Sequence, residues 1–292
     1  MPKTIAVIGG TGLCDWPGAE LLGTREVETA YGAPSAPIHQ MRYKGAEFLF
    51  LPRHGVGHSL PPHAINYRAN IQALKDAGAG EIIAVNAVGG ISERFVAGVI
   101  ALPEQINDYT WGREHTFYDG RDGNVQHIDF SYPYCEELRL RLCAAAQTAD
   151  IDVEPYGTYA VTQGPRLETA AEIQRLARDG NDMVGMTAMP EAALAREAGL
   201  DYASVCLVVN PGAGLSDTLI TMEDIQVTLA DINGDALYLS HSRSGKNYQS
   251  GPHSFELSKL YPNPFNPSTE VSFSLPIDGH VHLAAFDVRG KE

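Results

Sequence analysis

Short apolar runs recur along the first three-quarters of the chain, and each ends in glycine or in polar residues. We interpret them as buried strands at residues 5–8, 47–51, 82–85, 183–186 and 202–209. Segments typical of helices lie between several of them, at residues 66–75, 136–149, 169–178 and 192–198. Strands that alternate with helices predict an α/β fold built on one sheet.

Several of the predicted strand ends carry groups that suit an anion. Arg53 and His54 follow one strand, Asn86 and Ala87 follow the next, and Asn210 ends the longest apolar run. Ligands of α/β sheets collect at the carboxyl ends of strands. An ordinary surface turn would explain any one of these positions. Their recurrence at several strand ends favours a common ligand site.

The stretch from Gly185 to Leu200 is the most informative of these junctions. Pro190 suits the first turn of a helix, and Glu191 places a negative charge at the positive end of its dipole. Thr187 then lies on the turn between strand and helix, where a hydroxyl and backbone N–H groups can face an anion. A plain strand-to-helix connection is the alternative interpretation.

The turn Gly9-Gly10-Thr11-Gly12 follows the first strand and lets backbone N–H groups approach a phosphate. It does not complete a dinucleotide fingerprint, because Asp15 stands where the third glycine would be. A dinucleotide-dependent oxidoreductase is therefore disfavoured.

Composition narrows the class of protein. The formal net charge of −15 disfavours binding to nucleic acid or to an anionic membrane surface. The four cysteines lack metal-ligand spacing and read as reduced thiols, so we expect no metal site. We expect neither a signal peptide nor a membrane-spanning segment, and hence a cytoplasmic protein.

Taken together, these motifs resemble the trimeric purine nucleoside phosphorylases. The matching stretches are residues 8–12, 53–55, 85–90, 117–120, 163–168, 185–190 and Asn210, in the family's order. The branch of S-methyl-5′-thioinosine and S-methyl-5′-thioadenosine phosphorylases is the most similar. The resemblance implies a twisted mixed β-sheet flanked by helices in a single domain. It also implies phosphorolysis of a purine nucleoside without metal or cofactor, with inorganic phosphate as co-substrate.

The resemblance also assigns roles to residues. Phosphate binding is implied for Thr11, Arg53, His54, Asn86, Ala87 and Thr187, with Asn86 standing where the methylthioadenosine branch has threonine. The nucleoside is implied to meet Met186, Leu167, Glu168 and Asn210, and catalysis is implied for Asn210, His54 and Thr187. His127 would reach the active site of a neighbouring subunit, which implies a homotrimer.

The residues at the base site separate the branches. Methylthioadenosine phosphorylases carry aspartate at the position of Asn210 and again two residues later, where this chain has Gly212. An amide can donate to a 6-oxo group, whereas a carboxylate accepts from a 6-amino group. Glu168 matches the carboxylate that accepts the N1–H of 6-oxopurines. We therefore expect methylthioinosine as the preferred substrate, with inosine, guanosine or methylthioadenosine as alternatives.

The resemblance ends at about residue 225. We expect a phosphorylase domain at 1–225, a divergent segment and linker at 226–254, and a β-rich tail at 255–292. Alternation from Val227 to Leu239 predicts a strand in place of the family's C-terminal helix, so an inactive nucleoside-binding chain is an alternative. The run Tyr261-Pro262-Asn263-Pro264-Phe265-Asn266-Pro267 resembles a truncated bacterial secretion sorting domain. That resemblance implies export, which conflicts with the cytoplasmic expectation and indicates a fusion.

Overall fold

The structure is a computed structural model that describes residues 3–10, 18–121, 123–216, 220, 225–229, 256–261 and 270–274. Two compact units make up the chain, Met1–Gly245 and Lys246–Glu292. Thr11, most of the predicted linker and most of the predicted β-rich tail lie outside the described residues.

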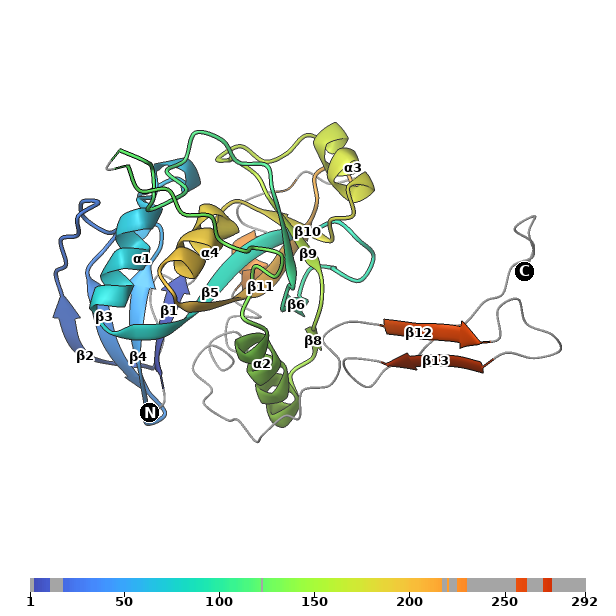
Figure 1. Ribbon diagram of the computed structural model, residues 1–292, viewed down its shortest axis with the longest axis horizontal. Helices are drawn as coiled ribbons and strands as arrows, with labels where there is room; N and C mark the ends of the chain where they lie inside the picture. Colours follow the sequence, from blue (N-terminus) through green and yellow to red (C-terminus); the bar gives the residue numbers. More distant parts are fainter. Residues whose placement is uncertain are drawn as a thin grey trace. The chain divides into compact units, whose positions relative to one another are not determined.

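Eleven strands of the described residues form one mixed sheet in the first unit (Figure 1). Its strands are β1 Thr4–Gly9, β2 Glu20–Arg25, β3 Ile38–Tyr43, β4 Ala46–Pro52, β5 Ala79–Gly90, β6 Ile100–Ala101, β7 Gln105–Asp108, β8 Val153–Glu154, β9 Thr158–Val161, β10 Met183–Gly185 and β11 Asp201–Pro211. Strands β4, β1, β5 and β11 are parallel neighbours. The ends of these four strands therefore meet at one edge of the sheet.

Strand β5 joins the two halves of the sheet. Its first part pairs with β1, and nearly its whole length pairs with β11. At its end Gly89 and Gly90 pair antiparallel with Val184 and Met183 of β10. Strand β10 continues through β9 to β7 in parallel. This mixed pairing confirms the predicted α/β fold.

Helices cover both faces of the sheet: α1 Tyr67–Asp76, α2 Glu136–Ala149, α3 Ala170–Arg178 and α4 Ala188–Glu197. Short 3₁₀ turns occupy Val56–His58 and Pro62–Ala64. Asn66 caps α1 by accepting the Ala69 N–H, and Thr169 forms a capping box with Glu172 at the start of α3. The helix starts predicted at residues 66 and 169 thus coincide with capping side chains.

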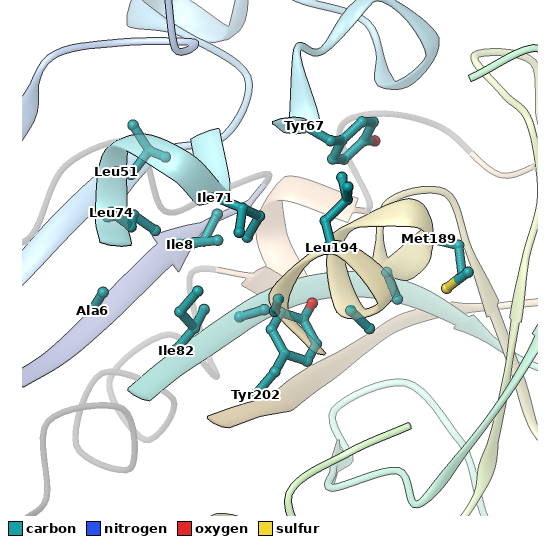
Figure 2. Packing of buried hydrophobic residues seen from close by; sticks show 14 of the residues in the cluster. Ala6, Ile8, Leu51, Tyr67, Ile71, Leu74, Ile82, Met189, Leu194 and Tyr202 are labelled. Atoms are coloured by element: carbon teal, nitrogen blue, oxygen red, sulfur yellow. The ribbon is translucent and has the colours of Figure 1, made fainter. Parts of the chain in front are cut away.

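Alternate residues of the central strands enter two different hydrophobic cores. Ala6 and Ile8 of β1 pack with Ile71 of α1 and Leu194 of α4, as Figure 2 shows. The intervening Ile5 and Val7 belong to the cluster that includes α2. Burial on both faces explains why these strands are continuous apolar runs in the sequence.

The structure differs from the sequence interpretation in two places of the first unit. Strands β2 and β3 form an antiparallel hairpin that was not predicted, because β2 is largely exposed and lacks an apolar run. Residues 225–229 are helical, where alternation from Val227 predicted a strand. Ile225 and Leu229 of this segment are buried in the α2 core, a spacing of four that fits a helix.

In the second unit, β12 Glu256–Tyr261 and β13 Glu270–Ser274 form an antiparallel pair. Both strands lie in the segment 255–292, for which a β-rich tail was expected. Whether this unit is a sorting domain stays a prediction.

Candidate active site

A cavity of about 420 Å³ lies where the strand ends meet. Among the described residues, nine of the predicted site residues line it: Arg53, His54, Asn86, Ala87, Leu167, Glu168, Met186, Thr187 and Asn210. They lie in the second half of β5, at the end of β11, and in the segments after β4, β9 and β10. The fold therefore brings together residues that are far apart in sequence: Arg53 and Asn210 are separated by 157 positions (210 − 53).

Two predicted site residues are not part of this lining. Thr11 lies outside the described residues. His127 is exposed and does not line the cavity. Its expected role concerns a neighbouring copy of the chain and stays a prediction. Phe117 and Phe130, in the loop that also carries His127, are half-buried and pack against the core.

Arg53 is held rigidly beneath the cavity. Its Nε and Nη2 donate to the Glu191 carboxylate at 2.7 and 2.8 Å, and its Nη1 donates to the Val85 carbonyl at 2.9 Å. Glu191 also accepts the Tyr202 hydroxyl at 2.8 Å. Arg53 and Glu191 are both fully buried. Burial by itself lowers the pKa of Arg53, but the charge of the Glu191 carboxylate and its hydrogen bonds outweigh this effect and raise the pKa above its ordinary value.

His54 is neutral and has a defined tautomer. Its Nδ1 lies 2.8 Å from the Leu60 carbonyl, which can only accept, so Nδ1 carries the proton and Nε2 keeps its lone pair. Burial lowers the pKa of His54 to about 4, helped by the positive charge of Arg53. Toward a ligand, Nε2 can therefore accept a hydrogen bond at neutral pH.

Asn86, in the second half of β5, and Thr187, just after β10, form a buried chain of hydrogen bonds. The Asn86 amide nitrogen donates to Ala84 O and to the Ser204 hydroxyl, each at 3.2 Å. Its oxygen accepts the Thr187 hydroxyl at 3.0 Å. Since Ala84 O can only accept, this arrangement fixes which way the amide faces.

Glu168 and Asn210 supply further polar groups of the lining. The Thr162 hydroxyl donates to Glu168 at 2.6 Å, and the Asn210 amide donates to the carbonyl of Pro211 at 2.7 Å. Both side chains can still bind a ligand. Glu168 has a second carboxylate oxygen, and Asn210 has a second N–H and its amide oxygen.

Part of the lining was missed by the sequence interpretation. His58, Ser59, Leu60, Pro61 and Pro62 line the cavity from the segment after β4, and Ile220 and Ile225 add apolar surface. The pairing of Glu191 with Arg53 and the role of Arg113, described below, were also missed. A usable signal existed for Glu191, because a carboxylate inside an apolar helix normally requires a buried cationic partner.

The described residues contain no group of three or more His, Cys, Asp or Glu side chains placed to hold a metal ion. Within the same residues, none of the helices combines the length and apolarity needed to span a bilayer.

Comparison with known proteins gives a consistent result. The family model of the phosphorylase superfamily matches residues 4–236. A probable S-methyl-5′-thioinosine phosphorylase of Pseudomonas syringae pathovar tomato is 55% identical over 226 residues, covering 77% of this chain and 92% of the relative. The 6-oxopurine nucleoside phosphorylase of Pyrococcus furiosus is 44% identical over 230 residues, covering 77% and 85%.

A solved structure has the same fold. Methylthioadenosine phosphorylase from Schistosoma mansoni in complex with adenine superposes with a TM-score of 0.78 at 32% identity, covering 82% of this chain and 89% of that one. With the family match, the relatives and the shared fold in agreement, this chain belongs to the phosphorylase superfamily.

Proposed function

We propose that this chain is a purine nucleoside phosphorylase that prefers S-methyl-5′-thioinosine. A phosphate oxygen bonds to C1′ of the sugar as the bond from C1′ to purine N9 breaks. The electron pair leaves with the base, which takes up a proton, and the products are hypoxanthine and a ribose 1-phosphate derivative. The single observation that carries the proposal is one cavity that joins Arg53, His54 and Thr187 with Glu168 and Asn210.

The phosphate subsite lies on the side of Arg53, His54, Asn86 and Thr187. Arg53 directs its remaining N–H groups to the anion, and His54 Nε2 accepts a phosphate O–H. Thr187 contributes its hydroxyl and backbone N–H from the turn that follows β10. Ala87 lies next to Asn86 in β5. Groups fixed before the substrate arrives stabilise the transition state without a reorganisation cost.

The purine subsite lies on the side of Glu168 and Asn210. Glu168 accepts the N1–H of a 6-oxopurine, and Asn210 donates to the base and stabilises the charge that develops at N7. The relatives named for 6-oxopurine or methylthioinosine substrates support this choice over a 6-amino base. Met186 meets the sugar hydroxyls, and Leu167 adds contact area beside Glu168.

The apolar part of the lining supports a methylthio group at the 5′ position. Leu60, Pro61, Ile220 and Ile225 present hydrocarbon to the same cavity that holds the polar groups. A thioether loses little on transfer to such surroundings, whereas a 5′-hydroxyl would lose a hydrogen bond to water.

Assembly and location are further parts of the proposal. We infer a homotrimer in which His127 completes a neighbouring site, and an enzyme of the cytoplasm that needs no cofactor beyond phosphate. The tail from residue 255 is proposed to be an appended sorting-type segment without a role in catalysis.

The test is phosphate-dependent release of hypoxanthine from methylthioinosine, run beside inosine and methylthioadenosine. We expect kcat/KM for methylthioinosine to exceed the other two, and no release without phosphate. The Thr187→Val variant keeps the shape of the side chain and should raise KM for phosphate more than KM for the nucleoside. A folded wild-type protein that binds hypoxanthine but releases none from any nucleoside would leave only the binding function.

A further inference from the structure

Arg113, in the loop between β7 and α2, collects backbone carbonyl groups from two turns of the site. Its Nη1 donates to Met186 O at 2.8 Å and to Met189 O at 2.5 Å. Its Nη2 donates to Gln163 O at 2.9 Å and to Thr162 O at 3.3 Å. One guanidinium thus joins the turn after β9 to the turn between β10 and α4.

A third segment of the cavity wall is linked to the same guanidinium. Arg113 Nη1 lies 3.3 Å from the Tyr67 hydroxyl, which donates to the carbonyl of Pro62 at 2.9 Å. Pro62 lines the cavity, as do residues of the other two segments. Arg113 itself is not part of the lining, so it acts from behind the walls.

The position of Arg113 is energetically unfavourable for a charged group, because it is removed from water. Its side chain is buried, and none of the ion pairs found among the described residues includes it. Carbonyl dipoles and the ring of Tyr67, 5.5 Å away, take the place of a counter-ion. Only a planar fork with several donors can serve so many carbonyl oxygens at once.

The contacts of Arg113 set the direction of groups that face the cavity. A peptide unit is planar and trans, so holding the Met186 carbonyl also fixes the N–H of Thr187, which points the opposite way. On the other turn, Arg113 holds the carbonyl of Thr162, whose hydroxyl donates to Glu168 at 2.6 Å. The same cation therefore influences both the Thr187 side and the Glu168 side of the site.

We propose that Arg113 is a positioning residue that sets the spacing between the phosphate-side turn and the base-side turn of the cavity. This inference rests on the proposed function for the identity of the two ligands. Without the guanidinium of Arg113 the two turns can move apart. Phosphate and nucleoside would then both lose contacts with the site.

The experiment replaces Arg113 by Lys, which keeps the charge and removes the fork. We expect kcat/KM to fall by about 10- to 100-fold, as for catalytic groups displaced by up to 1 Å. The KM values for phosphate and for methylthioinosine should both rise. Calorimetric titration with phosphate and with hypoxanthine, which needs no turnover, should show weaker binding of each.

The matched control is Arg139→Lys. Arg139 is also buried, but it binds Glu136 and the carbonyl of Pro155 and does not line or support the cavity. This variant should lose stability and leave both KM values unchanged. Unchanged KM values and affinities in folded Arg113→Lys, with only a smaller active fraction, would overturn the positioning role.

A second variant covers the case in which Arg113→Lys does not fold. Tyr67→Phe keeps the ring and removes the hydroxyl that links Arg113 to Pro62. We expect several-fold weaker binding of both ligands from the loss of this link, and unchanged affinities would overturn the inference. If the wild type binds both ligands but catalyses no reaction, the proposed function is wrong. The affinities of the wild type and the variants for phosphate and hypoxanthine then still test the role of Arg113. A wild type that binds neither ligand overturns both.

Discussion

The guanidinium of Arg53 forms two hydrogen bonds with the carboxylate of Glu191, and neither side chain is exposed. The cation beneath the proposed phosphate subsite is therefore neutralised within the fold. Arg53 has five N–H donors, and three of them are used by Glu191 and Val85. What it offers an anion is two N–H groups of fixed direction.

Replacing Glu191 by Gln should strongly destabilise the protein, because it leaves a buried guanidinium without a counter-ion. We expect the free energy of unfolding to fall by about 3–5 kcal/mol. Urea denaturation at pH 7 measures this loss. Glu47→Gln is the control, since its pair with Arg42 is exposed and a much smaller loss is expected. Equal losses in the two variants would contradict a special role for the buried pair.

Because Gly10 has no side chain, the guanidinium of Arg53 can lie close to its backbone. A Cβ at this position would lie 2.5 Å from the Val85 carbonyl oxygen and 2.9 Å from Arg53 Nη1. Gly10→Ala should therefore displace the guanidinium, lower the free energy of unfolding by about 1–3 kcal/mol and raise KM for phosphate. Gly23→Ala is the matched control, because a Cβ there meets nothing within 4 Å. Phosphate KM that stays unchanged in both variants would show that Arg53 tolerates displacement.

The low pKa of His54 predicts how stability depends on pH. Its pKa is about 4 in the folded chain, compared with the ordinary value of 6.5 that applies to the unfolded chain. As pH falls, the unfolded chain therefore takes up the proton first. Stability is then lost between about pH 6.5 and pH 4, by roughly 3 kcal/mol in total. Denaturation at pH 7 and pH 4.5 should show a large difference for the wild type and a smaller one for His54→Gln.

His54 should also leave no inflection near neutral pH in the profile of kcat/KM, which reports the enzyme without bound substrates. Arg53 and His58 are the neighbouring groups that face its ring, and neither adds negative charge that would restore an ordinary pKa. An NMR titration of the His54 ring that gives a midpoint near 6.5 would contradict both statements about this residue.

The parts of the fold that were predictable are those encoded in local sequence. Central strands such as β1 are buried on both faces, so they are apolar throughout, and capping residues such as Asn66 and Thr169 mark the starts of helices. The hairpin of β2 and β3 could not be predicted, because its half-exposed strands are stabilised by pairing rather than by an apolar pattern.

The candidate site divides in the same way. His54 was found because parallel strands bring their carboxyl ends together. Thr187 was found because it lies on a turn between a strand and a helix, where a hydroxyl and backbone N–H groups can face an anion. The pairing of Arg53 with Glu191 joins positions 138 residues apart, and that of Arg113 with Met186 joins positions 73 apart. Such contacts depend on the completed tertiary structure, and no local pattern specifies them.

Asn210→Asp is the sharpest test of base recognition. Asn210 lines the cavity, and its amide donates to Pro211 O at 2.7 Å, which leaves one N–H and the oxygen for the purine. A carboxylate can accept from a 6-amino group but cannot donate to a 6-oxo group. The ratio of kcat/KM for methylthioinosine to that for methylthioadenosine should therefore fall by roughly 10- to 100-fold, the size expected for a hydrogen bond to a charged group.

The control for this change is Asn66→Asp, which adds the same charge at the start of α1, where aspartate is also a good cap. It should leave the substrate ratio unchanged, since Asn66 does not line the cavity. If the ratio is the same in wild type and Asn210→Asp, Asn210 does not read the 6-position of the purine. The preference would then have to come from Glu168, whose carboxylate accepts only from a base that carries N1–H. Glu168→Gln, measured with the same two nucleosides, separates these explanations, because it should weaken methylthioinosine alone.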